Sequence, residues 1–236
     1  MEPDDFRRYA AEFIGTFFLV FFAAGAAMVS AFAPAPAGAV IAGLGSGLVL
    51  MIVIWIFANI SGGHVNPALS IALWLTGAFP ARLIPGYVTA QLAGSAIGGL
   101  CLLSAFGRVP GMGANLPDIA SGITPLQALE VEFLLSFAMM MVIVLSIAER
   151  GIPGKFFAVP IGAIVGLNVM LFGASHGASM NPARAFGPYL ANGDWTFYWI
   201  YVLGPLAGLL LASIVCRYVF GLPQAPAPDA DEQRQT

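Results

Sequence analysis

Long stretches of this chain contain no charged residue, and this limits its possible folds more than any other feature of the sequence. Only 9% of the 236 residues are charged and 59% are hydrophobic, whereas a soluble domain carries charge on roughly a quarter of its residues. A helix crosses the roughly 30 Å apolar core of a bilayer with about 20 residues, and several uncharged stretches reach that length. We therefore expect a membrane protein. The ten-residue alternation typical of membrane barrels is absent, so the fold class should be all-α.

The rest of the composition gives little sign of other functions. The net charge of −3 comes mainly from acidic ends, and no basic cluster indicates a nucleic-acid partner. Cys101 and Cys216 lie in apolar runs, where a thiol behaves as a small hydrophobe. The two histidines offer no metal-ligand spacing, so we expect no metal site. The first apolar run, residues 13–32, is longer than the hydrophobic part of a typical signal peptide, and we expect it to be retained.

Clusters of Gly and Pro divide the apolar sequence into six long helices. The expected spans are residues 9–31, 39–59, 83–106, 125–148, 156–173 and 196–220. We expect residues 1–222 to form a single transmembrane domain. The tail, residues 223–236, is rich in Pro, Ala, Asp and Gln, a composition that predicts disorder.

Two further apolar segments, residues 66–75 and 181–190, are too short to cross a bilayer. Each begins with Asn-Pro-Ala and follows a stretch rich in Gly and Ser. Asn is a good N-cap, and Pro suits the first turn of a helix. We therefore expect two half-helices that begin at the motif residues Asn66, Pro67, Ala68, Asn181, Pro182 and Ala183.

Basic residues are distributed unequally between the two sides of the membrane. If six spans alternate in direction, most Lys and Arg fall on one side; Arg108 lies in a loop on the opposite side, and Arg184 falls within the second short segment. Cytoplasmic loops carry the excess of Lys and Arg. We therefore expect a multi-pass protein of the plasma or inner membrane with both termini in the cytoplasm. The residues on the cytoplasmic side are Arg7, Arg8, Arg82, Arg150, Lys155, Arg217 and Arg234.

The chain contains an internal repeat. Residues 64–68, HVNPA, recur as SMNPA 115 residues later, and Glu12-Phe13 recurs as Glu132-Phe133 near the start of the fourth span. Each copy, about residues 6–106 and 125–220, holds three spans, an odd number, so the second copy is inverted relative to the first. Inverted repeats with short broken helices that meet at the membrane midplane are a transport architecture.

Two half-helices that enter from opposite faces would bring their N-termini together near the bilayer centre. Each terminus carries unpaired N–H groups and about half a positive charge, which repels cations. The amides of Asn66 and Asn181 would donate hydrogen bonds into the opening and orient a water there, which interrupts a proton wire. Non-helical backbone at this depth must line a cavity or be buried in protein. We therefore expect a ladder of carbonyl acceptors from Gly62, Gly63, His64, Gly177, Ala178 and Ser179.

These two segments resemble the signature loops of the aquaporin and aquaglyceroporin family. The resemblance rests on SGGHVNPA at residues 61–68 and NPAR at residues 181–184, and it extends over residues 6–220. It implies six spans with two half-helices, a homotetramer with one pore per subunit, passive conduction of small neutral solutes and water, and no cofactor. Glu12 and Glu132 match the family's buried glutamates, which accept hydrogen bonds from the loop backbone.

The same resemblance implies a four-residue constriction near the outer mouth. Alignment from each Asn-Pro-Ala assigns this selectivity filter to Ser46, Val169, Ala178 and Arg184. The water-selective pattern instead resembles Phe, His, a small residue and Arg. The glycerol pattern has aromatic residues at the first and third positions and an Asp after the Arg, where this chain has Ala185. Because two bulky groups are missing, we expect a wider pore, similar to the branch that passes boric, silicic or arsenous acid together with glycerol and urea.

Other interpretations compete with this one. A water-selective aquaporin is one alternative, and an ion-coupled secondary transporter is another, because inverted repeats are shared with that class. Residues 173–177, GASHG, match the G-x-S-x-G pattern of hydrolases, but that pattern requires a preceding strand, and we expect no enzyme. For His64 we favour a role through its carbonyl oxygen over a protonation gate, and His176 is expected either to contact solute or to pack within the loop.

Overall fold

The structure, a computed structural model, describes residues 3–148 and 154–221. Within these ranges the chain is helical and contains no strand. Six long helices are each apolar enough to span a membrane: α1 (Pro3–Ser30), α2 (Ala35–Ser61), α4 (Ile84–Phe106), α5 (Pro125–Ala148), α6 (Ala158–His176) and α8 (Ile200–Tyr218). The shorter elements are α3 (Pro67–Leu75), α7 (Pro182–Asn192), and the 3-10 segments η1 (Ala81–Leu83), η2 (Pro110–Gly113) and η3 (Ile119–Ser121). The predicted all-α fold with six membrane spans and two half-helices is confirmed.

The first two helices begin earlier than the sequence suggested. α1 begins at Pro3 instead of residue 9, with Asp4 and Asp5 in its first turn, where carboxylates are stabilised by the positive end of the helix dipole. α2 begins at Ala35 instead of residue 39, and a proline lies within its first two positions, where a missing N–H costs nothing. The prolines that were read as a break therefore start the helix.

The last two spans also differ at their ends. α6 continues past Gly173 and ends at His176, because the residue that leaves the helix is Gly177, with φ of 96°. α8 begins at Ile200 instead of residue 196. The Asp194 side chain accepts hydrogen bonds from the backbone N–H and the hydroxyl of Thr196, a local turn that competes with the helix. The tail predicted to be disordered, residues 223–236, and the basic residues at positions 150 and 234 lie outside the described residues.

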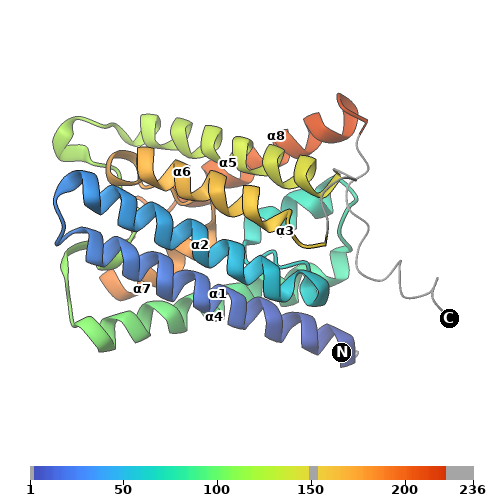
Figure 1. The fold of residues 1–236 in the computed structure, drawn as a ribbon, viewed down its shortest axis with the longest axis horizontal. Helices are drawn as coiled ribbons and strands as arrows, with labels where there is room; N and C mark the ends of the chain where they lie inside the picture. The colour runs from blue at the N-terminus through green and yellow to red at the C-terminus, as the bar shows by residue number, and fades with distance from the viewer. Residues whose placement is uncertain (1–2, 149–153, 222–236) are drawn as a thin grey trace.

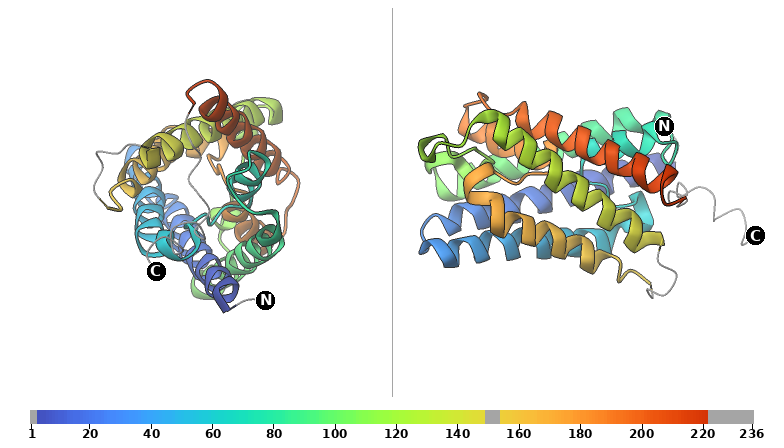
Figure 2. Two further views of the ribbon diagram at one scale, coloured as in Figure 1. Left: turned by 90° about the vertical axis from the view of Figure 1, so that its right-hand side faces the viewer. Right: turned by 90° about the horizontal axis from the view of Figure 1, so that it is seen from above.

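The long helices form two sets with matching contacts. α1 packs against α2 and α4, α5 packs in the same way against α6 and α8, and α2 packs against α6 across the two sets. The helices run roughly side by side in Figure 1, and the view along the long axis in Figure 2 shows them arranged in a ring. These matching contacts are those expected of an inverted repeat.

Matching glycines allow the closest helix contacts in each half. A Cβ added to Gly94 on α4 would collide with the carbonyl oxygen of Phe13 on α1, and a Cβ added to Gly208 on α8 would collide with that of Phe133 on α5. Small residues let membrane helices approach until their backbones touch. The same packing device therefore positions Glu12 and Glu132, each of which immediately precedes one of these phenylalanines.

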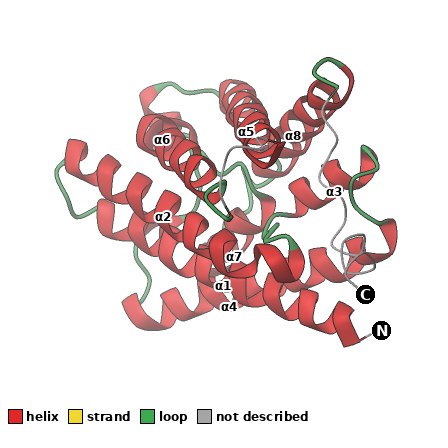
Figure 3. Ribbon diagram, turned by 45° about the vertical axis from the view of Figure 1, so that its right-hand side comes forward, coloured by secondary structure: helices red, strands yellow, loops and turns green. Residues whose placement is uncertain are grey.

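Each half-helix packs against a long helix of the other half: α3 against α8, and α7 against α4. Figure 3 shows where α3 and α7 lie among the long helices. On α4, the Ser95 hydroxyl donates to the carbonyl of Ala183 and accepts from the backbone N–H of Gly187 at 2.7 Å. At the end of α3, the Thr76 and Ser213 hydroxyl oxygens lie 2.9 Å apart. The position of each short helix is thus set by the opposite repeat.

The outside of the bundle exposes large apolar side chains, as lipid contact requires; examples are Phe22, Ile52, Leu134, Leu171 and Leu203. The first turn of α1 and the last turn of α8 lie at the same end of the bundle (Figure 1). Basic residues gather there: Arg82 Nη1 donates to both carboxylate oxygens of Asp5 at 2.9 Å, and Lys155 Nζ donates to the Trp55 carbonyl at 2.8 Å.

Candidate functional site

The two Asn-Pro-Ala segments meet at the centre of the bundle. Asn66 Oδ1 accepts from the backbone N–H groups of Ala68 (3.0 Å) and Leu69 (3.4 Å), and so caps α3. Asn181 Oδ1 caps α7 in the same way, accepting from the backbone N–H groups of Ala183 (2.9 Å) and Arg184 (3.2 Å). Both half-helices therefore begin at the residue after the asparagine.

Each asparagine also binds the opposite loop. Asn66 Nδ2 donates to the Met180 carbonyl at 2.9 Å, and Asn181 Nδ2 donates to the Val65 carbonyl at 2.7 Å. From the sequence, these amides were expected to face the opening alone. Since an amide carries two N–H bonds, the structure uses one from each asparagine to join the loops and leaves the other for the space between them.

The residues before the asparagines have unusual backbone geometry. Val65 has φ of 42° and Met180 has φ of 54°, a region that is strained for residues with a side chain and most of all for a β-branched one. Each such residue costs about 1–3 kcal/mol and persists only where its surroundings impose it. At both positions a carboxylate does so, because Glu12 Oε2 accepts from the Val65 N–H at 2.6 Å and Glu132 Oε2 accepts from the Met180 N–H at 2.8 Å.

Glu12 is fully buried and accepts from four donors. Besides Val65, these are the backbone N–H of His64 (2.9 Å), the hydroxyl of Ser61 (2.7 Å) and Nε2 of Gln91 (2.7 Å). The donors come from the end of α2, from the first loop and from α4. The carboxylate therefore joins the loop to two helices at once.

Glu132 is equally buried but is held more sparingly. In addition to Met180, its Oε1 accepts from the backbone N–H of Ser179 at 2.6 Å. The Ser179 hydroxyl donates to the carbonyl of Asn181 at 2.8 Å. Among the described residues, the Glu132 carboxylate thus accepts hydrogen bonds from backbone N–H groups alone, and other residues complete the support of the second loop.

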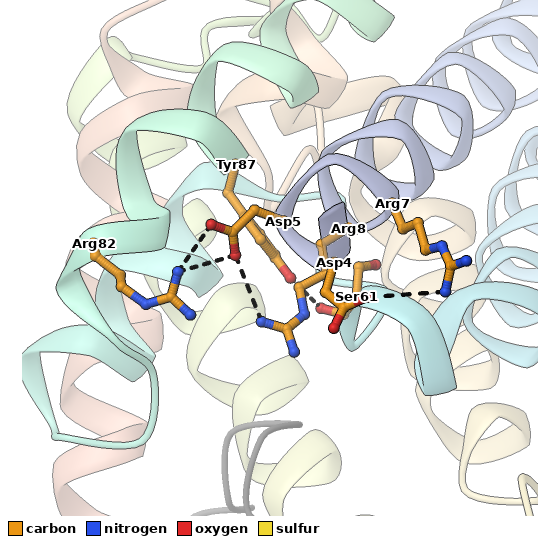
Figure 4. A network of polar contacts seen from close by, with 7 residues as sticks. All are labelled: Asp4, Asp5, Arg7, Arg8, Ser61, Arg82 and Tyr87. Carbon is orange, nitrogen blue, oxygen red and sulfur yellow. Dashed lines mark hydrogen bonds and ion pairs between the residues drawn. The ribbon is translucent and has the colours of Figure 1, made fainter. Parts of the chain in front are cut away.

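A polar cluster behind the first loop anchors it to the start of α1 and α4 (Figure 4). The Tyr87 hydroxyl donates to the Ser61 carbonyl at 2.7 Å, and the aromatic ring of Tyr87 packs edge-on against that of His64 with centroids 5.3 Å apart. Asp5, whose side chain is only 9% exposed, pairs with Arg82 at 2.9 Å. These contacts place the cluster beside the loop and outside its opening.

Three tyrosines support the second loop. The hydroxyls of Tyr201 and Tyr198 donate to the carbonyls of His176 (3.0 Å) and Pro182 (3.2 Å), one on each side of the loop. The Tyr189 hydroxyl donates to the carbonyl of Asn115 at 2.8 Å. Burial raises the pKa of Tyr198, which precedes α8, to about 12. The Tyr198 hydroxyl therefore stays protonated as a donor.

A cavity of about 50 Å³ lies between the loops. Its lining includes Asn66, Asn181 and loop residues of both repeats. It also includes apolar side chains of the long helices, among them Leu19, Leu50, Ile143, Ile161 and Val165. Of the predicted carbonyl residues, Gly63, His64, Ala178 and Ser179 line this cavity.

Two predicted lining residues lie elsewhere. Gly62 caps the end of α2 and is exposed, so it does not line the cavity. Gly177 lines a neighbouring cavity of about 280 Å³, and its carbonyl accepts from Asn115 Nδ2 at 2.6 Å. The helix extends to the residue before each glycine, and this shortens the run of open backbone that the sequence suggested.

The four residues assigned to the constriction come together. Ser46, Val169, Ala178 and Arg184 all line the central cavity, and Val169 and Arg184 also line the neighbouring one. They come from α2, α6, the second loop and α7. Val169 and Arg184 therefore lie where the two cavities adjoin, and Ser46 and Ala178 lie on the central cavity.

Arg184 is buried, with 8% of its surface exposed. Its Nη1 donates to the carbonyl of Gly113 (2.9 Å) and to Asn115 Oδ1 (2.8 Å), and its Nη2 lies 3.5 Å from the carbonyl of Ala23. None of these partners is a carboxylate. Among the described residues no direct ion pair therefore neutralises the guanidinium, which lines both cavities.

The two histidines are held by neighbours. His64 Nδ1 lies 2.9 Å from the Ser70 hydroxyl, and His64 lines the central cavity. His176 Nδ1 lies 2.8 Å from the Ser175 hydroxyl, and His176 lines neither of the two cavities described above. Ser175 belongs to the G-x-S-x-G match, which falls at the end of α6 with no strand before it in the described chain. No group of three potential metal ligands occurs among the described residues.

Several supporting residues were missed by sequence reasoning. Gln91 had a usable signal, because a glutamine within a membrane span is expected to have a structural or functional partner. Asn115 and the three tyrosines had none, since they lie in the 107–124 connection or at helix ends, where polar residues are ordinary. Their contacts join residues that are far apart in sequence: Tyr198 and Pro182 are 16 residues apart, and Asn115 and Gly177 are 62 residues apart.

Comparison with known proteins agrees with this geometry. Residues 1–216 match the family described as Major intrinsic protein. The chain is 36% identical to aquaporin AqpM of Methanothermobacter marburgensis, with 90% of this chain and 97% of that protein covered. It is 35% identical to aquaporin TIP1-2 of Zea mays, with 92% of this chain and 87% of that protein covered. The crystal structure of the aquaglyceroporin from Plasmodium falciparum superimposes with a TM-score of 0.78 at 26% identity, covering 92% of this chain and 97% of that one.

Proposed function

The chain belongs to the major intrinsic protein family, whose members are membrane channels and not enzymes, and from this premise we propose that it conducts small uncharged solutes and water passively while excluding ions and protons. The observation that carries the proposal is the central cavity, lined by Asn66, Asn181 and all four predicted constriction residues. A line of hydrogen-bonding groups along an apolar wall can replace the hydration of a neutral solute. The apolar wall offers an ion nothing in place of the rest of its hydration shell.

Cation exclusion follows from three positive features beside the cavity. The N-termini of α3 and α7 each carry about half a positive charge, and Arg184 adds a full one. A water between the asparagines accepts from the N–H of each amide that is not used in joining the loops. Such a water cannot also accept a proton from its neighbour, so the proton wire is interrupted.

The proposed solute range follows from the small side chains at the constriction. Ser46 contributes a hydroxyl, Val169 and Ala178 contribute little bulk, and Arg184 contributes donors. Neutral molecules with several hydroxyl or amide groups fit this chemistry. We propose metalloid hydroxides such as arsenous, boric and silicic acid, together with glycerol and urea.

A water-selective channel is the second candidate function. It is favoured by the size of the central cavity, about 50 Å³, which has room for only a few waters at about 10–15 Å³ each. Named relatives of the chain are aquaporins. The two functions differ only in whether solutes larger than water pass the constriction.

Stopped-flow light scattering of proteoliposomes separates these functions. Vesicles with the purified protein are mixed with gradients of sucrose, glycerol, urea or arsenous acid, and empty vesicles serve as the control. We expect faster water efflux in sucrose and faster reswelling with the permeant solutes. Water flux without any solute flux would show that the channel is water-selective and that the proposed solute range is wrong.

An ion-coupled carrier is disfavoured by the state of the carboxylates. Such a carrier needs an acidic group that faces the substrate path, but Glu12 and Glu132 each accept hydrogen bonds from loop backbone. Flux through a channel rises linearly with the gradient. Saturating flux that depends on a proton or sodium gradient would support the carrier instead.

We propose that the protein is a homotetramer of the plasma or inner membrane, that residues 1–222 form its single channel domain, and that both termini are cytoplasmic. The apolar outer surface and the basic residues at one end of the bundle support this proposal. Native mass spectrometry of the detergent-solubilised protein tests the tetramer. Protease accessibility of terminal tags in intact cells and in inverted vesicles tests the orientation.

A further inference from the structure

Asn115 lies in the connection between α4 and α5, is 4% exposed, and touches the second loop and α7. We propose that Asn115 is a positioning residue that holds the Arg184 guanidinium where the two cavities adjoin, and that it thereby sets the selectivity of the channel for solutes relative to water. The inference rests on the proposed channel function. It adds a residue to the selectivity machinery that lies outside both Asn-Pro-Ala segments and outside the four constriction positions.

Both polar atoms of the Asn115 side chain are engaged. Oδ1 accepts from Arg184 Nη1 at 2.8 Å, and Nδ2 donates to the Gly177 carbonyl at 2.6 Å. The backbone carbonyl of Asn115 accepts from the Tyr189 hydroxyl at 2.8 Å. The side chain therefore joins the arginine to the backbone of the loop that precedes it, while α7 holds the asparagine itself.

The two terminal nitrogens of Arg184 are held unequally, and Asn115 binds the one that is held more firmly. Both N–H bonds of Nη1 go to the 107–124 connection, to Asn115 Oδ1 and to the Gly113 carbonyl at 2.9 Å. Nη2 has only a long contact of 3.5 Å to the Ala23 carbonyl. Two bonds on one nitrogen fix the plane of a guanidinium. They direct the remaining N–H groups in one constant direction, along the boundary lined by Arg184 and Val169.

Loss of Asn115 would free the arginine to move. A buried hydrogen bond to a charged group contributes enough to change a conformational equilibrium about tenfold or more. The cavity on one side of Arg184 has a volume of about 280 Å³, which offers space for a displaced guanidinium. When Arg184 leaves the boundary, the opening between the cavities widens and the positive charge moves away from it.

Asparagine is the residue type that fits these partners. Aspartate would accept from Arg184 Nη1 but would place a second acceptor against the Gly177 carbonyl, and its charge would offset that of the arginine. Alanine would contact neither. The two variants therefore separate the position of the guanidinium from its net charge.

The experiment is a double-mutant cycle on the ratio of urea to water permeability in proteoliposomes. The proteins are the wild type, Asn115→Ala, Arg184→Ala and the double variant. We expect Asn115→Ala to raise the ratio severalfold and Arg184→Ala to raise it further. We expect Asn115→Ala to add nothing in the Arg184→Ala background, because residues that act through one another are not additive. An equal change of the ratio in both backgrounds would overturn the proposal, since a general loosening of the structure does not depend on Arg184.

Ser121→Ala is the matched control. Ser121 lies in the same connection, and its hydroxyl donates only to Asp118 Oδ2 at 2.6 Å, so its loss disturbs the connection away from the arginine. We expect the wild-type permeability ratio. If this variant reproduces the effect of Asn115→Ala, the role of Asn115 is purely structural and the proposal is wrong.

Asn115→Asp keeps the proposal testable if the alanine variant does not fold. The aspartate retains the acceptor for Arg184 and lowers the net positive charge at the boundary. We expect a urea-to-water ratio close to the wild type together with a measurable cation leak in a valinomycin-clamped proton flux assay. A raised ratio without a leak would contradict the assigned geometry.

The cycle also separates this inference from the proposed solute range. If the wild type conducts water alone, the solute range fails, but Asn115→Ala should still admit urea in a manner that requires Arg184. If the wild type conducts urea and Asn115→Ala leaves the ratio unchanged, the channel function stands and the role of Asn115 fails.

Discussion

The two Asn-Pro-Ala loops share a backbone but differ in what holds them. In each, a residue with positive φ precedes the asparagine, a buried glutamate accepts from its N–H, and the asparagine amide donates across to the other loop. Glu12 has four donors that include the side chains of Ser61 and Gln91, whereas Glu132 has two backbone donors. The repeat thus preserves the shape of the loop and leaves its support free to vary.

The difference has a functional side. Position 69, which corresponds to Arg184 in the repeat, is a leucine. The first loop is packed from behind by an aromatic and polar cluster, while the second is held by tyrosine hydroxyls and by the connection that also binds the arginine. We therefore propose that the first loop acts mainly as a frame and that the second combines the frame with the charged constriction.

The largest expected effect is the loss of a glutamate. Glu12→Ala leaves four buried donors without their acceptor, and each orphaned donor costs about 1–3 kcal/mol. We expect little folded protein, measured by monodispersity and thermal unfolding in detergent. Glu132→Ala loses two donor contacts and should be less severe.

Glu12→Gln and Glu132→Gln serve as controls, because glutamine keeps the size and one acceptor of the side chain. Equal destabilisation by the two alanine variants would contradict the conclusion that Glu12 holds its loop more firmly than Glu132 does.

Removing the charged group should have the next largest effect. We expect Arg184→Ala to raise urea or glycerol permeability about tenfold, equivalent to about 1.4 kcal/mol, and to admit a cation leak. Leu69→Ala changes the corresponding position of the other repeat and should leave the ratio of solute to water permeability unchanged. A similar change of that ratio in both variants would mean that selectivity is shared between the loops.

Narrowing the constriction beside the second loop should have a smaller, solute-specific effect. In Ser46→Phe and Val169→His, a ring enters the boundary of the cavities, so we expect glycerol and urea fluxes to fall severalfold while water flux persists. Stopped-flow reswelling measures both. Unchanged solute flux in both variants would show that these residues do not form the constriction.

The smallest effects should come from single supporting hydrogen bonds. Gln91→Leu removes two contacts that support the first loop, to Glu12 on α1 and Ser70 on α3, and should lower the free energy of unfolding by about 1–3 kcal/mol. Tyr201→Phe removes one neutral contact of the second loop and should cost about 1 kcal/mol. Thermal unfolding of the purified variants in one detergent measures the order. The reverse order would show that the second loop is the more dependent on its side-chain support.

The two loops also show which features of the fold could be predicted from the sequence. The six membrane spans, the two half-helices and the matching of the two repeats could be predicted, because each depends on local signals: the length of an uncharged run, and an Asn-Pro at a helix start. Helix ends were less predictable. Pro36 was read as part of a break and Gly173 as the last residue of a span, but a proline in a first turn and a glycine within a membrane helix are both tolerated.

The sequence by itself determined that the chain crosses a membrane six times and carries two inverted Asn-Pro-Ala segments, since hydrophobic length and capping act over a few residues. Only the tertiary structure decided that the asparagines bind each other's loops, that Val65 and Met180 adopt positive φ, and that Gln91, Asn115 and the tyrosines hold the loops. Those contacts join residues far apart in the chain. A buried donor must find an acceptor wherever the packing of helices brings one near. The spacing of residues in the sequence does not indicate which donor and acceptor will be brought together.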